Sequence, residues 1–182
     1  MTPPPKVKMS SSTPDSPSSK TSTSRRALAA VLTVSDSCSR GEKEDASGPA
    51  VAAALEKHNF QIVARDVVAD DRPTIQQKLI ELCRSARLVV STGGTGVAPR
   101  DVTPEATVAV CDRVVEGVAE QMRLAGMRKT HFAALGRGIC GVRETSLILN
   151  LPGNPAGAVE SLEAVIDLLP HALELIAGNT GH

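Results

Sequence analysis

Short apolar runs alternate with helix-length amphipathic segments from residue 27 to about residue 178, and this alternation restricts the fold more than any other feature. Four of the runs are predicted to be strands: residues 28–34, 61–68, 88–90 and 145–150. The predicted helices lie between and after them: residues 48–58, 73–84, 103–127 with a break near 111–115 or at Gly117, 156–169 and 171–177. Such an alternation is typical of α/β proteins, in which helices cover both faces of a parallel sheet.

The first 26 residues differ in composition from the rest of the chain. They consist almost entirely of Ser, Thr, Pro, Lys and Arg, and they contain few apolar side chains. Because such a segment buries too little apolar surface to offset its ordering entropy, we expect residues 1–26 to be disordered. Residues 27–178 are expected to form one domain.

The twin arginines Arg25 and Arg26 precede the apolar residues 27–32, an arrangement also found in export signals. Cleavage after that run would remove the first predicted strand, so we interpret the run as a strand. The four cysteines are scattered without a C-x-x-C pair, and no two histidines have ligand spacing. These patterns indicate reduced, structural thiols in a cytoplasmic protein, without a zinc site.

Charge and aromatic content argue against nucleic acid as a partner. The chain has 20 basic and 20 acidic residues, but the first 26 residues hold five of the basic ones against Asp15, so the remainder has an excess of four acids. Phe60 and Phe132 are the aromatic residues, which leaves few surfaces for base stacking. No segment is long enough to span a membrane.

Polar or glycine-rich clusters follow each of the four predicted strands. The residues in these clusters are Ser35 and Asp36, then Asp70 and Asp71, then Thr92 to Asp101, and then Pro152, Gly153, Asn154 and Pro155. Ligands of such sheets bind outside the carboxyl ends of the strands, so we expect one site at that edge.

The segment after the third strand, residues 91–105, is predicted to be a phosphate-binding loop. The predicted binding residues in it are Thr92, Gly93, Gly94, Thr95, Gly96 and Arg100. Glycines allow successive N–H groups to converge on an anion, although a plain tight turn would also use them. Thr103 is predicted to cap the following helix, with Pro104 at its first position.

A second glycine pattern, at Gly136, Gly138 and Gly141, has dinucleotide-fingerprint spacing but lacks the required context. A strand follows it instead of a helix, so we interpret residues 136–141 as a flexible connection or a hairpin turn.

Asp70 and Asp101 are the candidate catalytic and metal-binding residues, because carboxylates and substrate phosphates together suit Mg²⁺. Asp71 is expected to be a solvated loop residue, as are most of Glu42, Glu44 and Asp45. Ser47 and Gly48 are candidates for binding a second anion through backbone donors. No Cys, His or Ser is placed for covalent catalysis, which favours direct group transfer.

Several motifs together resemble the molybdopterin adenylyltransferases of the MogA/MoaB type. They are residues 35–41 (SDSCSRG), 45–49 (DASGP), 91–96 (STGGTG) with 100–106 (RDVTPEA), and 151–155 (LPGNP). The resemblance implies a three-layer α/β/α sandwich with a mostly parallel sheet, usually assembled as a homotrimer. It also implies transfer of AMP from ATP to the terminal phosphate of molybdopterin, with release of pyrophosphate.

The resemblance places the two functional aspartates of this family at Asp70 and Asp101, and its pterin and nucleotide pockets at the glycine loop and residues 152–155. The Arg100-Asp101 pair is retained, which favours the catalytic branch of the family. Gly136 stands before Arg137 where the family commonly has Ser, so one hydroxyl contact is missing. Two alternatives remain: a non-catalytic molybdopterin-binding or carrier protein, and a scaffold or molybdate-insertion role. The product could be handed to a molybdate insertase.

Overall fold

The computed structural model describes residues 26–179, and the expected disordered tail therefore lies almost wholly outside the described residues. One six-stranded sheet has the order β2-β1-β3-β6-β5-β4. Its strands are β1 (Ala27–Val34), β2 (Phe60–Val68), β3 (Leu88–Thr92), β4 (Arg113–Val114), β5 (Cys140–Arg143) and β6 (Ser146–Leu151). Strands β2, β1, β3 and β6 are mutually parallel, whereas β5 is antiparallel to both β6 and β4. The predicted mostly parallel sheet is confirmed.

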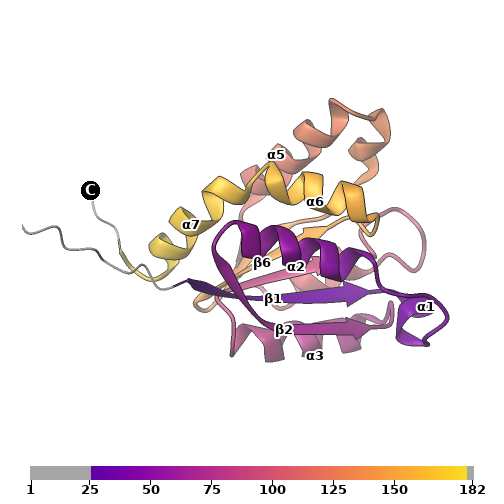
Figure 1. Cartoon of the computed structure of the whole chain (residues 1–182), viewed down its shortest axis with the longest axis horizontal. Coiled ribbons are helices and arrows are strands. Elements are labelled where there is room, and N and C mark those ends of the chain that lie inside the picture. The colour runs from indigo at the N-terminus through magenta and orange to yellow at the C-terminus, as the bar shows by residue number, and fades with distance from the viewer. Residues whose placement is uncertain (1–25, 180–182) are drawn as a thin grey trace, which may run out of the picture.

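Helices cover both faces of the sheet, which makes three layers (Figure 1). The α-helices are α1 (Asp36–Ser39), α2 (Ser47–Lys57), α3 (Arg72–Cys83), α4 (Thr103–Val108), α5 (Glu116–Met127), α6 (Pro155–Glu163) and α7 (Leu169–Ile176). Two 3₁₀ helices, η1 (His131–Leu135) and η2 (Ile166–Leu168), complete the described part of the chain. One apolar core joins the sheet to α2, α5, α6 and α7, and a second core joins it to α3 and α4.

Alternation along β1 shows how the sequence produces two cores. Ala29 and Val31 belong to the first core, whereas Ala30, Leu32 and Val34 belong to the second. Successive side chains of a strand point to opposite faces, so a strand with a core on each side is apolar throughout. This explains why the central strands were recognisable as continuous apolar runs.

The hairpin of β5 and β6 corrects the interpretation of residues 136–141. Gly141 lies inside β5 and pairs with Ile148, and the turn lies at Glu144, whose φ is +50°. Residues 136–139 form the connection from η1 into β5. Strand β5 has only four residues, so its apolar pattern is too short to indicate a strand.

Other predicted boundaries shift by a few residues. The expected break in the long helix is confirmed, because α4 ends at Val108, β4 follows, and α5 begins at Glu116. The last predicted helix pair is divided differently, since α6 ends at Glu163 and η2 precedes α7. All four cysteines are free thiols, and Cys140 is fully buried. None of the helices in residues 26–179 is long and apolar enough to cross a membrane.

Candidate active site

The carboxyl ends of the four parallel strands meet around a cavity of about 230 Å³. The end of each strand, or the segment that follows it, contributes to its lining. The predicted site residues in the wall are Ser35, Ser47, Asp70, Thr92, Gly93, Gly94, Asp101, Gly153 and Pro155. The structure thus brings together the polar clusters that follow separate strands, as expected for a parallel sheet.

A second cavity, of about 490 Å³, lies on the other side of the glycine loop. Gly94, Asp101 and Gly153 line both cavities, and Thr95, Gly96 and Pro152 line the second one. Its remaining wall comes from α5, η1 and the start of the β5 connection, and includes Met122, Phe132, Leu135, Gly136 and Gly138. The site therefore has a small polar compartment and a larger, more apolar one that share the loop as a wall.

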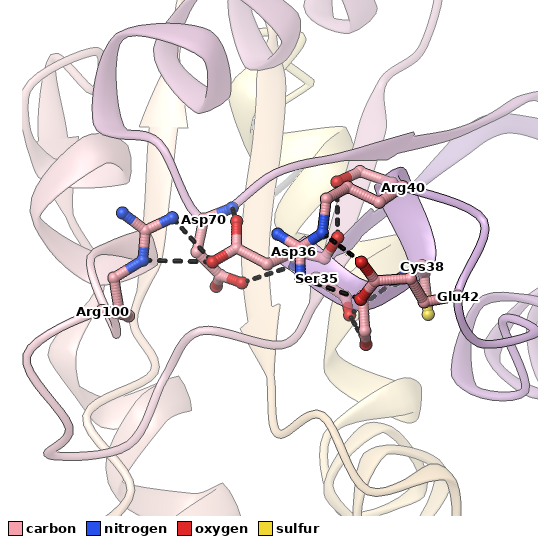
Figure 2. A network of polar contacts seen from close by, with 9 residues as sticks. Ser35, Asp36, Cys38, Arg40, Glu42, Asp70 and Arg100 are labelled. Atoms are coloured by element: carbon pink, nitrogen blue, oxygen red, sulfur yellow. Dashed lines mark hydrogen bonds and ion pairs between the residues drawn. The ribbon is translucent and has the colours of Figure 1, made fainter.

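The ends of β1 and β2 are interlocked by two aspartates (Figure 2). The backbone N–H of Asp36 donates to Asp70 Oδ2 at 2.9 Å, and the backbone N–H of Asp70 donates to Asp36 Oδ1 at 3.0 Å. The Arg100 guanidinium donates to Asp36 Oδ2 through Nη2 at 2.6 Å and Nε at 3.1 Å. This network fixes Asp70 against the end of β1 and links both aspartates to the loop that carries Arg100.

The same network gives its two carboxylates opposite electrostatic environments. The hydrogen bond from Arg100 lowers the pKa of Asp36. Burial raises the pKa of Asp70, against the opposing effect of the Asp36 backbone hydrogen bond. Asp70 is thus a carboxylate whose charge lacks full compensation, which is typical of a group that receives a cation.

Asp101 is held by its own loop. Ala98 N–H donates to Asp101 Oδ2 at 2.8 Å, and Asp101 N–H donates to the Ala98 carbonyl at 2.9 Å. A Cβ added to Gly96 would lie 2.8 Å from Asp101 Oδ2, so a side chain there would require the Asp101 carboxylate to shift. A Cβ on Gly94 would lie 3.0 Å from Asp70 Oδ1. The two glycines therefore let both carboxylates lie against the loop backbone.

Gly93 begins the loop at the most crowded point of the site. Its φ is +104°, and its N–H donates to the Leu151 carbonyl at 3.1 Å. A Cβ there would lie 2.1 Å from the Val34 carbonyl oxygen. Gly153 packs against it, with a Cβ position 3.2 Å from the Gly93 Cα, and Thr92 Oγ1 donates to the Pro152 carbonyl at 2.8 Å. The loop is thus seated tightly between the ends of β1 and β6.

The prediction that Thr103 caps α4 is wrong. Val102 is the N-cap residue, and Thr103 is the first residue of the helix. The Thr103 N–H donates to the Gly94 carbonyl, which ties the helix start to the loop. Its Oγ1 is buried, finds no hydrogen-bond partner among the described residues, and lies 2.4 Å from a Cβ position on Gly94.

Several predicted site residues have structural contacts. Asp45 accepts from Gly48 N–H at 2.9 Å and from Ser47 Oγ at 3.3 Å, so this backbone donor is already engaged. Asn154 caps α6 by accepting from Gly157 N–H. Asp71, expected to be merely solvated, instead caps α3 by accepting from Thr74, which lowers the pKa of Asp71. Asp36 and Arg100 lie beside the polar compartment and brace it.

The wall formed by α5 and η1 was not predicted from the sequence, and Arg137 was named only as the residue after Gly136, where the family has a Ser-Arg pair. Arg137 contacts the loop region at Gly96, Asp101 and Glu105, and Arg123 lines the larger cavity. These residues reach the site only because β5 pairs with β6 and brings the preceding segment to the loop. No local pattern around residues 119–138 indicates that placement.

Fold and site together define an α/β protein with a glycine loop and two carboxylates at the carboxyl edge of its sheet. The family model described as "Probable molybdopterin binding domain" matches residues 30–171. The chain is 42% identical over 153 residues to the molybdopterin adenylyltransferase of Helicobacter pylori (strain J99), covering 82% of this chain and 87% of that protein. The chain therefore belongs to the molybdopterin adenylyltransferase family, which confirms the resemblance seen in its motifs.

Two further relatives show how the domain is used elsewhere. The crystal structure of the molybdopterin biosynthesis enzyme MoaB from Thermus thermophilus has a TM-score of 0.79 and 49% identity, and covers 84% of this chain and 97% of that one. The molybdenum cofactor synthesis protein cinnamon of Drosophila melanogaster is 39% identical over 150 residues. The matched region is 80% of this chain but only 25% of that protein. A domain like this one therefore occurs both as nearly a whole protein and within a much longer one.

Proposed function

We propose that this protein acts in molybdenum cofactor biosynthesis by transferring AMP from ATP to the terminal phosphate of molybdopterin. The observation that carries the proposal is that Asp70 and Asp101, which follow β2 and β3 respectively, line one polar cavity walled by the glycine loop. The curated relatives that bear the name molybdopterin adenylyltransferase support it. The larger apolar cavity across the loop suits the flat ring system of one substrate.

The residues present fit a magnesium ion. Carboxylate and phosphate oxygens are the ligands that Mg²⁺ prefers, and Asp70 and Asp101 offer two carboxylates to one cavity. Within residues 26–179, no group of three or more His, Cys, Asp or Glu side chains is arranged to hold a metal ion by itself. Substrate phosphates and water would therefore supply the remaining ligands, as is usual for this ion. When bound, Mg²⁺ would neutralise charge on the phosphates as it develops during transfer.

The residues of the chain position the substrate phosphates and supply charged groups beside them. The backbone N–H groups of the glycine loop receive phosphate oxygens. The Arg100 guanidinium braces Asp36, and the interlocked Asp36 and Asp70 keep the ends of β1 and β2 fixed. A molybdopterin phosphate oxygen then bonds to the α-phosphorus of ATP. The bond from that phosphorus to the bridging oxygen breaks, and its electron pair leaves with pyrophosphate.

The product can be identified directly. The full chain is mixed with ATP, MgCl₂ and molybdopterin, and adenylylated molybdopterin is sought by mass spectrometry together with released pyrophosphate. We expect product from the wild type and a rate lowered by about 100-fold or more in Asp101→Asn. If the wild type binds molybdopterin but forms no adenylylated product and releases no pyrophosphate, the protein is instead a carrier. Molybdate insertion by the chain without ATP would point to the insertion role.

We also propose a homotrimer, a cytoplasmic location and transfer of the product to a molybdate insertase, as the resemblance to this family implies. Exposed apolar side chains around a groove beside α5, including Val114, Leu124 and Met127, provide a surface suited to self-association. Light scattering is expected to give three times the chain mass, and a monomer mass would contradict the trimer. Cell fractionation tests the location, and co-purification with an insertase tests the transfer.

A further inference from the structure

We propose that Arg137 is a positioning residue that fixes the segment carrying Asp101 in its working geometry. The Arg137 guanidinium donates through Nε to the Gly96 carbonyl at 2.6 Å and through Nη2 to the Asp101 carbonyl at 2.6 Å. Its Nη1 donates to Glu105 Oε1, and its backbone N–H donates to the Thr95 carbonyl at 2.9 Å. One residue from the β5 connection thus holds both ends of the segment from Gly96 to Asp101.

Few other contacts hold this segment in place. Within it, Ala98 and Asp101 exchange two hydrogen bonds, which shape the turn but do not attach it to the body of the protein. Arg100 attaches it to Asp36, and the Arg100 side chain is 66% exposed. Exposed ion pairs contribute little to order, so Arg137 provides the firmest attachment that the described residues make to this segment.

The arrangement requires arginine. Three acceptors lie around the guanidinium, two of them backbone carbonyls and one a carboxylate on α4. A planar guanidinium offers five donors in a fixed fork, whereas a lysine ammonium is a point charge that cannot meet three acceptors in these directions. The ion pair also lowers the pKa of Glu105, whose Oε2 is buried without a hydrogen-bond partner among residues 26–179. Glu105 therefore depends on Arg137 for its compensation.

Arg137 acts through the loop and does not contact substrate. Its neighbours Gly136 and Gly138 line the larger cavity, but Arg137 lines neither that cavity nor the polar one. Loss of Arg137 should therefore disturb the placement of Asp101 more than the binding of ATP. A displacement of about 1 Å at such a group can lower turnover by about 100-fold.

The first test measures loop order in the substrate-free full chain, and it is independent of the proposed function. Hydrogen exchange is followed in peptides covering residues 94–102 of the wild type, Arg137→Gln and Arg87→Gln. Arg87 is a matched control, since it donates to the Thr145 and Leu173 carbonyls away from the site. We expect exchange to quicken by about tenfold or more in Arg137→Gln and to stay unchanged in Arg87→Gln. Unchanged exchange in Arg137→Gln would overturn the proposal.

The second test rests on the proposed function and measures pyrophosphate release. We expect kcat to fall by about 10- to 100-fold in Arg137→Gln, with KM for ATP within about threefold of the wild type. Arg137→Lys should not restore kcat, whereas Glu105→Gln, which keeps both carbonyl contacts, should lower it less than fivefold or so. Rescue by lysine, or an equal loss in Arg87→Gln, would contradict a positioning role. If the wild type releases no pyrophosphate, the proposed function fails and the exchange result still decides the role of Arg137.

Discussion

Gly93→Ala is expected to separate backbone crowding from backbone conformation at the centre of the site. The added Cβ would lie 2.1 Å from the Val34 carbonyl oxygen, whereas real Cβ atoms essentially never come nearer than 3.0 Å. The loop must therefore move away from β1 by about 0.9 Å, and it cannot do so freely because Gly153 packs behind it. The φ of +104° adds a conformational cost of about 1–3 kcal/mol.

These two effects together predict a loss of about 2–4 kcal/mol in the free energy of unfolding. For a domain of this size, that corresponds to a fall of roughly 5–15 °C in Tm. A shift of nearly 1 Å at the loop is also large enough to lower kcat by about 100-fold. Stability and turnover should therefore fall together in this variant.

Two glycines provide matched controls for the assay, which combines thermal unfolding with pyrophosphate release. Gly41 has a φ of +71° but open space around its Cβ position, so Gly41→Ala should lose only about 1–2 kcal/mol and keep its turnover. Gly117 lies in α5 with open space and no positive φ, so Gly117→Ala should gain about 0.5–1 kcal/mol. If Gly93→Ala unfolds like Gly41→Ala and retains full turnover, the argument from crowding is refuted.

Three further changes test other parts of the structure. Burial raises the pKa of Asp70, so the folded state binds the carboxyl proton more tightly than the unfolded state, and ionisation costs stability as the pH rises through this pKa. Asp70→Asn should therefore raise Tm more at pH 7 than at pH 4. A Tm difference that does not change with pH would contradict this. Asn150 is buried and its amide donates to the hydroxyl groups of Ser91 and Thr107, so Asn150→Ala should lower the free energy of unfolding in urea by about 2–4 kcal/mol. A loss below about 1 kcal/mol would show that these hydrogen bonds contribute little to stability. Burial raises the pKa of Cys140 to about 12, so iodoacetamide at pH 8 should label it only at the rate of unfolding, and rapid labelling of the folded protein would be inconsistent with the structure.

The parallel half of the fold was predictable because its strands are buried on both faces. Residues such as Ala30 and Val31 in β1 face different cores, so apolar residues follow one another without a polar interruption. The antiparallel half was not predictable in the same way. Strand β4 has only two residues, both exposed, and β5 has only four, three of them buried. Their pairing depends on tertiary contacts that leave little trace in the sequence.

The polar compartment could be predicted from sequence because parallel strands bring their carboxyl ends together. Asp70 and Asp101 do line one cavity, and their catalytic roles remain predictions. Local hydrogen bonds explain the predictions that were wrong or incomplete. Thr103 is drawn into α4 by its bond to Gly94, and Asp71 and Asn154 have side chains committed to helix caps. The contacts of Arg137 and the α5 wall could not be predicted, because a hairpin without a strong sequence pattern brings them to the site.

The interlocked ends of β1 and β2 also explain why the neighbouring residues Asp70 and Asp71 make different contacts. Asp70 faces the cavity and is bound to Asp36, whereas Asp71 turns away to receive Thr74 at the start of α3. Consecutive residues of an extended segment point in opposite directions, so only one of them can serve the site. Asp71 is therefore a matched control for substitutions of Asp70.

The measurement that tests the central claim most directly compares Asp70→Asn with Asp71→Asn in molybdopterin-dependent pyrophosphate release. Asparagine at position 71 can still cap α3, so Asp71→Asn should retain turnover within about twofold of the wild type. Asp70→Asn should remain folded and lose turnover by about 100-fold or more, because a carboxylate facing the cavity is lost. Full turnover in Asp70→Asn, or equal losses in the two variants, would contradict the assignment of the active site to this edge of the sheet.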